Sequence, residues 1–242
     1  MLDVPADARE DDGALPEVAE AWVRGWAVSR TTAPPVAVPG GHRVDVGLPG
    51  HLVRYVLPRF DPAVLRRLTG EPVAPGTWLK VCAVPETVAA VLPAGWAVRD
   101  PEYMMTASLR LAEPSAPAGY TLRVTTRGAV TDAEVLAAGE QVAGGEAVLA
   151  AGEQVAARGR IARTGPFAIV DQVETGPSHR RRGLGRLVMD ALCSHAAAQG
   201  ARTGVLVATR DGRALYRSLG WTSHAPVTAA VFRPGEGTPP AR

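Results

Sequence analysis

A glycine- and arginine-rich segment, residues 175–186, has the residue types of an anion-binding turn. It reads Thr-Gly-Pro-Ser-His-Arg-Arg-Arg-Gly-Leu-Gly-Arg and follows a predicted strand and opens a predicted helix. Gly183 and Gly185 let the backbone approach a ligand, and the first-turn amides of a helix are unsatisfied donors at the positive end of its dipole. The segment therefore predicts a phosphate site, and an exposed basic helix start is an equally good interpretation of the glycine spacing alone. Phosphate oxygens would also pair with Arg180, Arg181, Arg182 and Arg186.

The spacing of these glycines excludes two common phosphate motifs. Gly183-Leu-Gly185 lacks the third glycine of a dinucleotide fingerprint, and no Gly-Lys-Ser/Thr occurs in the chain. The stretch Arg180-Arg-Arg-Gly183-Leu-Gly185 instead resembles the acetyl-CoA signature of the GCN5-related N-acetyltransferases (GNAT), Gln/Arg-x-x-Gly-x-Gly/Ala at a helix start. Pro177, three residues before the first arginine, fits the same family pattern.

The resemblance implies which residues bind coenzyme A. Backbone amides of the turn would hold the pyrophosphate, and the preceding strand would pair its backbone with the pantetheine arm. An amide at Val173 or Thr175 would polarise the acyl carbonyl. Family members often have valine where this chain has Thr175, a departure that leaves a backbone contact intact. The implied binding residues are Val173, Thr175, Arg180, Arg181, Arg182, Gly183, Leu184, Gly185 and Arg186.

A second segment supports the same resemblance. Arg213-Ala-Leu-Tyr216-Arg-Ser-Leu-Gly220-Trp221 is similar to the family's Ala-x-x-Leu-Tyr-x-x-Leu-Gly-Phe. In many relatives this tyrosine protonates the departing coenzyme A thiolate. A phenol with a pKa of about 10 is protonated at neutral pH and can donate its proton to a thiolate whose parent thiol has a pKa of about 8.5. The alternative for Tyr216 is a half-buried core aromatic.

Acyl transfer to an amine also needs the amine in its neutral form, and therefore a base or a water chain. Asp171 and Glu174 lie on the strand beside the expected thioester. Strand alternation puts residues 171 and 173 on one face and Gln172 with Glu174 on the other. Glu174 is the first candidate, and a structural hydrogen bond is an equally good role for it. His179 and His195 are expected to face solvent or an anion.

Composition excludes several classes of protein. The 242 residues include 26 basic and 24 acidic side chains, too balanced for nucleic acid or an anionic membrane as main partner. The two cysteines lie in apolar stretches and read as buried free thiols, and the histidines show no metal-ligand spacing. No metal site is expected. No apolar run is long enough for a membrane span, and no secretory signal is seen, so a cytoplasmic location is expected. One lysine among many arginines is typical of a GC-rich bacterial genome.

The predicted elements give an α/β fold, a GNAT-like mixed and mostly antiparallel sheet flanked by helices. They include strands over residues 51–57 and 167–175 and a short helix over residues 212–219 capped by Asp211. A longer helix is predicted over residues 183–199, and the residues that share its apolar face are Leu184, Leu187, Val188, Ala191 and Leu192. Residues 1–112 form a predicted N-terminal α/β domain, 113–119 a linker, 120–233 the catalytic domain and 234–242 a disordered tail. Within the catalytic domain, the sequence of residues 135–143 is repeated identically at residues 148–156. We interpret this duplicated segment as part of a β-meander.

The catalytic part also lacks the pair of helices that normally follows the family's first strand. The N-terminal half is therefore either a degenerate companion half of the same fold or a replacement wall over the acceptor site.

The resemblance implies an enzyme that moves an acetyl group from acetyl-CoA to a primary amine, by direct attack in a ternary complex. The alternative is a non-catalytic acyl-CoA sensor on the same fold. The acceptor is a small-molecule or peptide amine whose identity the sequence leaves open, and a homodimer is possible. The first residues to consider for an acceptor pocket, all of which also suit a core, are Trp22, Trp26, Tyr55, Tyr103, Met104 and Met105.

Overall fold

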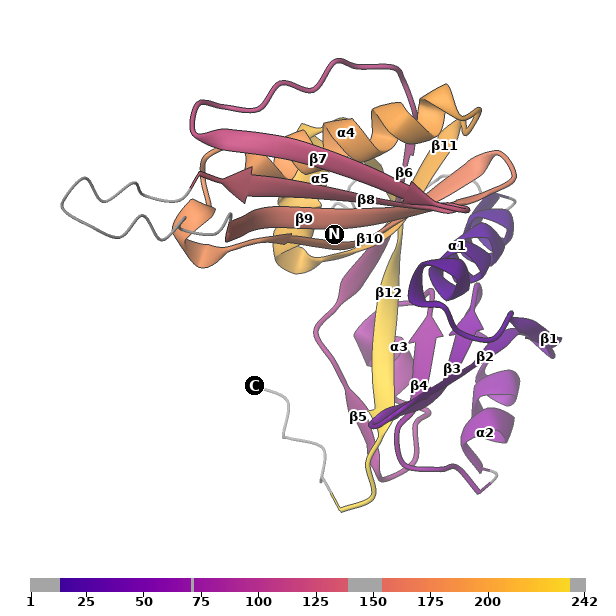
Figure 1. Ribbon diagram of the computed structural model, residues 1–242. Helices are drawn as coiled ribbons and strands as arrows, with labels where there is room; N and C mark the ends of the chain where they lie inside the picture. The colour runs from indigo at the N-terminus through magenta and orange to yellow at the C-terminus, as the bar shows by residue number, and fades with distance from the viewer. Residues whose placement is uncertain (1–13, 71, 139–153, 236–242) are drawn as a thin grey trace, which may run out of the picture. The chain divides into compact units, whose positions relative to one another are not determined.

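The computed structural model describes residues 14–70, 72–138 and 154–235, and its internal contacts divide into two compact units (Figure 1). The first unit holds residues 1–107 and 205–242, and the second holds residues 108–204. The C-terminal strand belongs to the first unit because it pairs with strands from the N-terminal part. The linear domain boundaries predicted from the sequence stay a prediction.

The first unit is built on a mostly antiparallel sheet. Its strands run in the order β1-β2-β3-β4-β12-β6, with β3 and β4 parallel and β5 also paired to β12. Strand β11 (Thr203–Thr209) begins at the boundary of the units. The other elements are α1 (Ala14–Arg30), β1 (Val36–Val38), β2 (Gly41–Leu48), β3 (His51–Leu57), α2 (Pro62–Gly70), β4 (Thr77–Val81), α3 (Pro85–Ala89), β5 (Trp96–Val98), β6 (Glu102–Ser108), α5 (Arg210–Ser218) and β12 (Thr222–Phe232).

The two faces of this sheet have different chemistry. One face packs its apolar side chains, including Leu57 and Leu79, against Leu65 of α2 and Val88 of α3. The opposite face carries Arg54 and Lys80, because side chains alternate along β3 and β4. Both cations are buried, Arg54 at 9% and Lys80 at 6% exposure. A buried cation needs partners, and the tryptophans of α1 and an acidic residue of β6 supply them.

Helix α1 covers the cationic face with an aromatic stripe. The Arg54 guanidinium lies 3.9 Å from the ring centre of Trp26, a close cation–π contact. Its Nε donates to Nε2 of His51 at 3.2 Å, and the His51 ring lies 5.4 Å from Trp78. Trp22 and Trp26 are therefore core residues, as their helical spacing indicates. Burial, together with the charges of Arg54, Lys80 and Arg30, lowers the pKa of His51 to about 4.

We expect His51 to make the folded protein sensitive to mild acid. The His51 ring takes up a proton near pH 6.5 in the unfolded chain and only near pH 4 in the folded chain. The contribution of neutral His51 to the free energy of unfolding is therefore fully present above pH 6.5 and is lost as the pH falls toward 4. The ring is partly exposed, so the expected loss is about 1 kcal/mol. Urea unfolding of wild type and His51→Gln at pH 7 and pH 4.5 measures it. A stability difference between the two proteins that is the same at both pH values would contradict the assignment.

Among its described residues, the second unit is a four-stranded antiparallel sheet with a helix on one face (Figure 1). It comprises β7 (Tyr120–Arg127), β8 (Val130–Ala137), β9 (Gln154–Thr164), β10 (Phe167–Thr175), a 3-10 turn (Pro177–His179) and α4 (Leu184–Ala198). Strands β7 and β8 are joined by residues 128–129, so the helix pair expected after the first strand is indeed missing there. The duplicated segment lies largely outside the described residues, as do residues 236–242 of the predicted tail.

Close packing of α4 on β9 depends on Gly159. A Cβ at this position would lie 2.6 Å from Cγ1 of Val188 and 3.1 Å from Cδ1 of Leu192. Both partners are buried residues of the apolar face predicted for α4. Only glycine lets the helix approach this closely, and the approach fixes where its N-terminal turn lies relative to β10.

The fold class is confirmed as a mixed, mostly antiparallel sheet flanked by helices. One local prediction is wrong. The cap of α5 is Thr209, whose Oγ1 accepts from the amide of Gly212 at 3.2 Å, whereas Asp211 lies inside the first turn. Thr209, two residues before Asp211, has the extended backbone that a cap requires.

Candidate functional site

The arginine- and glycine-rich segment forms a tight turn between β10 and α4. Arg181 and Gly183 both have positive φ, 63° and 77°, so the chain coils sharply just before the helix. No side chain caps α4 at Gly183. A left-handed arginine is uncommon and costs about 1 to 3 kcal/mol. The turn therefore presents the start of the helix to solvent with its capping position open to a ligand.

The four arginines of the turn are exposed, and Arg180 and Arg182 donate hydrogen bonds to neighbouring groups. Arg182 donates from Nη1 to the hydroxyl of Tyr120 at 3.0 Å, and that hydroxyl also contacts Nδ1 of His179 at 3.0 Å. Arg180 donates from Nε to the carbonyl oxygen of Thr175 at 3.4 Å. His179 therefore has a neighbouring side chain rather than solvent alone, and helps to orient a cation at the turn.

Strand β10 carries a β-bulge directly before the turn. Asp171 faces Arg160 and Glu174 faces Arg158, so three steps along β10 match two along β9. Gln172 has φ 56°, and its amide donates to Oδ1 of Asp171 at 3.0 Å. The strict alternation predicted from the sequence is therefore wrong here: the extra residue puts Asp171 and Glu174 on the same face.

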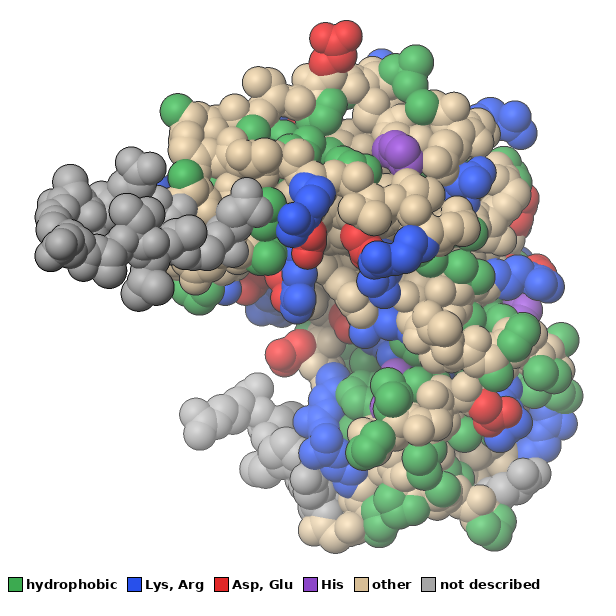
Figure 2. All heavy atoms as spheres, viewed as in Figure 1, with side chains coloured by type: hydrophobic (Ala, Val, Ile, Leu, Met, Phe, Trp, Pro, Cys, Tyr) green, Lys and Arg blue, Asp and Glu red, His purple; other side chains and the backbone are tan. Residues whose placement is uncertain are grey.

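This bulge completes a charged face on the side of the sheet opposite α4. Residues directly across from one another in an antiparallel sheet share a face, and here they form two rows. One row is Arg123, Glu134, Arg158 and Glu174, and the other is Thr125, Asp132, Arg160 and Asp171. Figure 2 shows basic and acidic side chains interspersed over this part of the molecule. We call these two rows, together with Arg127, the charged face.

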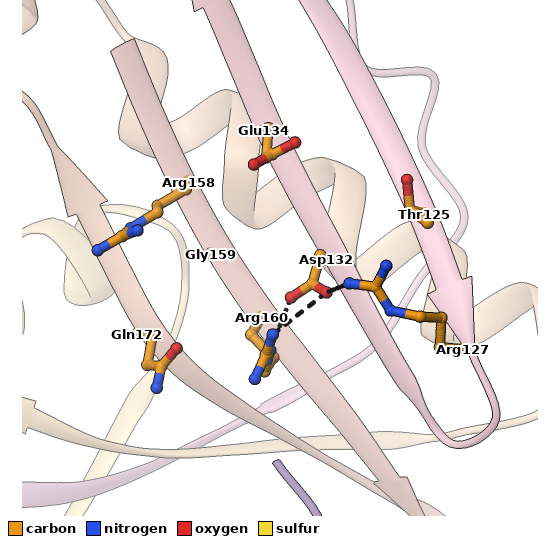
Figure 3. A pocket seen from close by; sticks show the side chains of 8 residues that line it. All are labelled: Thr125, Arg127, Asp132, Glu134, Arg158, Gly159, Arg160 and Gln172. Carbon is orange, nitrogen blue, oxygen red and sulfur yellow. Dashed lines mark hydrogen bonds and ion pairs between the residues drawn. The ribbon is translucent and has the colours of Figure 1, made fainter. Parts of the chain in front are cut away.

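A hollow of about 210 Å³ lies on the charged face (Figure 3). Asp132 is at its centre and accepts hydrogen bonds from Arg160 Nε at 2.6 Å and from Arg127 Nη2 at 3.0 Å. The bond to Asp132 raises the pKa of Arg160. The hollow is lined by Thr125, Arg127, Asp132, Glu134, Arg158, Gly159, Arg160 and Gln172.

The two predicted catalytic residues lie in different units. Glu174 is exposed and pairs with Arg158 at 2.8 Å, Arg158 donating from both Nε and Nη2. Tyr216 is on α5 in the first unit, half-buried, with its ring 6.0 Å from that of Trp221. The backbone amide of Trp221 donates to the carbonyl of Tyr216 at 3.0 Å and fixes the end of the helix.

The two cysteines and His195 have surroundings that suit a structural role. Burial raises the pKa of the Cys82 and Cys193 thiols to about 12 each, so both are protonated at neutral pH. His195 contacts Thr126 Oγ1 and Gln199 Nε2, each at 2.8 Å. Within the described ranges, no group of three or more metal-binding side chains occurs. None of the helices described here is long and apolar enough to cross a membrane.

The chain was compared with known families and structures. Residues 126–221 match the model of the acetyltransferase (GNAT) family, a range that contains both the turn and Tyr216. The resemblance seen in the two motifs is confirmed for this part of the chain. A search of curated proteins found no match.

Solved structures extend the likeness beyond that range. A GCN5-related N-acetyltransferase from Kribbella flavida is 19% identical, with a TM-score of 0.60 over 93% of this chain and 98% of its own. A putative GNAT acetyltransferase from Novosphingobium aromaticivorans is 18% identical, with a TM-score of 0.55 over 90% and 98%. A GCN5-related N-acetyltransferase-like protein from Streptococcus suis is 11% identical, with a TM-score of 0.54 over the same shares. The fold is thus shared across nearly the whole chain.

Sequence reasoning missed the lining of the hollow. It pointed to aromatic residues and methionines, of which Trp22, Trp26, Met104 and Met105 are buried in the first unit. The signal that could have found the hollow is the spacing of polar residues two apart on each strand, as in Asp132 and Glu134. Reading that signal across strands requires the register.

Proposed function

We propose that the protein is an acetyl-CoA-dependent N-acetyltransferase that transfers the acetyl group to a primary amine of a small molecule or peptide. Both reactants would be bound together, and the amine would attack the thioester directly. The observation that carries the proposal is the turn before α4. It combines an uncapped helix start, positive φ at Arg181 and Gly183, and exposed arginines.

The chemistry of this turn fits the pyrophosphate of coenzyme A. Backbone amides at Leu184 and Gly185 belong to the first helical turn, where N–H groups lack partners within the helix. Guanidinium groups of Arg180, Arg181, Arg182 and Arg186 add charge-assisted hydrogen bonds to phosphate oxygens. Arg182 is already oriented by Tyr120, which lowers the entropy lost on binding.

The residues that would act on the acyl group lie on β10 and α5. Acetyl-CoA supplies the acetyl group as a thioester. The bulge interrupts the ladder around Gln172 and Val173, which supports a role for backbone amides at Val173 or Thr175 in polarising the acyl carbonyl. Tyr216 is the proposed acid for the thiolate.

Glu174 is the proposed base. Its ion pair with Arg158 is exposed on both sides and therefore weak, so the pair leaves the carboxylate able to accept a proton. Loss of the acidic limb of the pH–rate profile in Glu174→Gln tests this role.

A matched pair of substitutions at Gly183 tests the turn itself. A Cβ at this position would have no neighbouring atom within 4 Å, and Asp and Asn both tolerate its left-handed backbone. Gly183→Asp places a negative charge where the phosphates would bind, and we expect at least tenfold weaker binding of acetyl-CoA by calorimetry. Gly183→Asn has nearly the same shape without the charge and is expected to bind within about threefold of wild type. Equal affinity of the two variants would contradict the phosphate site.

A further inference from the structure

The hollow on the charged face adjoins the strand on which the proposed function places the acyl group. Gln172, at the bulge of β10, lines it, and Arg158, which also lines it, is bonded to Glu174 two residues further along β10. The hollow and Val173 thus share one short stretch of backbone, with the charged side chains on one side and α4 on the other (Figure 3).

The lining of the hollow selects a polar ligand. None of its residues has an aliphatic or aromatic side chain, and all but Gly159 end in a charged or polar group. Ligand sites for apolar molecules are lined mainly by hydrophobic and aromatic side chains, so an aryl or alkyl amine has no partner here. A volume of about 210 Å³ is also below the 300 to 1,000 Å³ of sites for drug-sized ligands, which indicates a small acceptor.

The charges of the lining can bind both an anion and a cation. A guanidinium has five N–H donors. The bond of Arg127 to Asp132 uses one of them, and the bonds of Arg158 to Glu174 use two. The remaining donors suit the two oxygens of a carboxylate. Glu134 accepts from Arg123 through only one of its oxygens, which leaves acceptor capacity for an amine.

We propose that this hollow is the acceptor site and that the acceptor is a small amine that also carries a carboxylate, as an amino acid does. The inference rests on the proposed function. Arg158 would hold the carboxylate, and Glu134 with Gln172 would face the amine. In the transfer, the acceptor nitrogen forms the amide bond as the thioester C–S bond breaks. The amine loses one proton to a base and the departing thiolate gains one.

Sets of three related acceptors test the proposal with the full-length protein. Each of the amino acids found in proteins is compared, as the free molecule, with its amide and with the amine that lacks the carboxylate. For each acceptor, kcat/KM is measured by thiol release from acetyl-CoA. The expected result is that at least one amino acid is preferred about tenfold or more over both of its analogues. Arg158→Gln should lower this preference to near one, and should weaken binding of that amino acid in the presence of coenzyme A about tenfold by calorimetry.

Arg123→Gln is the matched control. Arg123 bonds a glutamate through the same two nitrogens as Arg158 does, on the same row, but it does not line the hollow. Its variant should keep the preference. If amines without a carboxylate are better acceptors than the amino acids, the inference is overturned and the proposed function stands. No acetylation of any amine by a protein that binds acetyl-CoA would overturn both.

Discussion

Replacing Tyr216 with Phe is expected to lower kcat by about 100-fold to 10,000-fold, the range that a positioned general acid contributes. The phenylalanine ring keeps the packing against Trp221, whose ring centre lies 6.0 Å from that of Tyr216, so the fold of α5 should be retained. Only the proton donor is lost. Because the hydroxyl is proposed to act on the departing thiolate and not on the phosphates, the Kd for acetyl-CoA should stay within about twofold. Steady-state thiol release and calorimetry measure the two quantities.

Tyr55→Phe is the control for this substitution. Tyr55 is another half-buried tyrosine of the first unit, and its ring packs against the core formed by Leu57 and Leu79. Loss of its hydroxyl should leave kcat unchanged. If Tyr216→Phe turns over as fast as Tyr55→Phe, Tyr216 is a core aromatic and the thiolate is protonated by another group.

Replacing Lys80 with Met is expected to reduce the free energy of unfolding by about 3 kcal/mol. Lys80 forms an ion pair with Glu102, and their side chains are only 7% and 23% exposed. The pair reaches across β12, where Ala229 faces Lys80 and Val227 faces Glu102. Burial lowers the pKa of Lys80 to about 8 even beside this carboxylate, so its charge is costly to bury. Removing it leaves the Glu102 charge without its partner, which costs more still.

The double variant Lys80→Met/Glu102→Leu separates these effects. Replacing both partners removes the uncompensated charge, and we expect stability within about 1 kcal/mol of wild type in urea unfolding. The exposed pair of Arg24 and Glu20, one helical turn apart on α1, is the control. Arg24→Met should cost less than about 0.5 kcal/mol. A Lys80→Met variant as stable as Arg24→Met would show that the buried pair is not a structural support.

The elements that local pattern determines could be predicted from the sequence. The strand over residues 51–57 and the strand over residues 167–175 have the predicted bounds, because alternation and flanking turn residues are local signals. Helix α4 buries the predicted face, with Leu187, Val188 and Leu192 at 5% exposure or less. The turn before α4 could be predicted for the same reason, since its glycines and arginines are contiguous.

Features that depend on register could not be predicted. The bulge at Gln172 has no glycine to mark its positive φ, and it reverses the side of the sheet on which Glu174 lies relative to Asp171. The charged rows join strands on both sides of the duplicated segment, whose pairing the sequence leaves open. The membership of β12 in the first unit likewise rests on pairing between strands more than a hundred residues apart.

The most direct test of the central proposal is acetyl transfer by the full-length protein itself. The protein, acetyl-CoA and a panel of amines that includes amino acids, polyamines and peptide N-termini are incubated, and thiol release and N-acetylated products are measured together by absorbance and mass spectrometry. The predicted result is one free coenzyme A thiol for each acetylated amine, at a rate that falls sharply in Tyr216→Phe. Binding of acetyl-CoA without an acetylated product from any amine is the behaviour of an acyl-CoA sensor and would contradict the proposal.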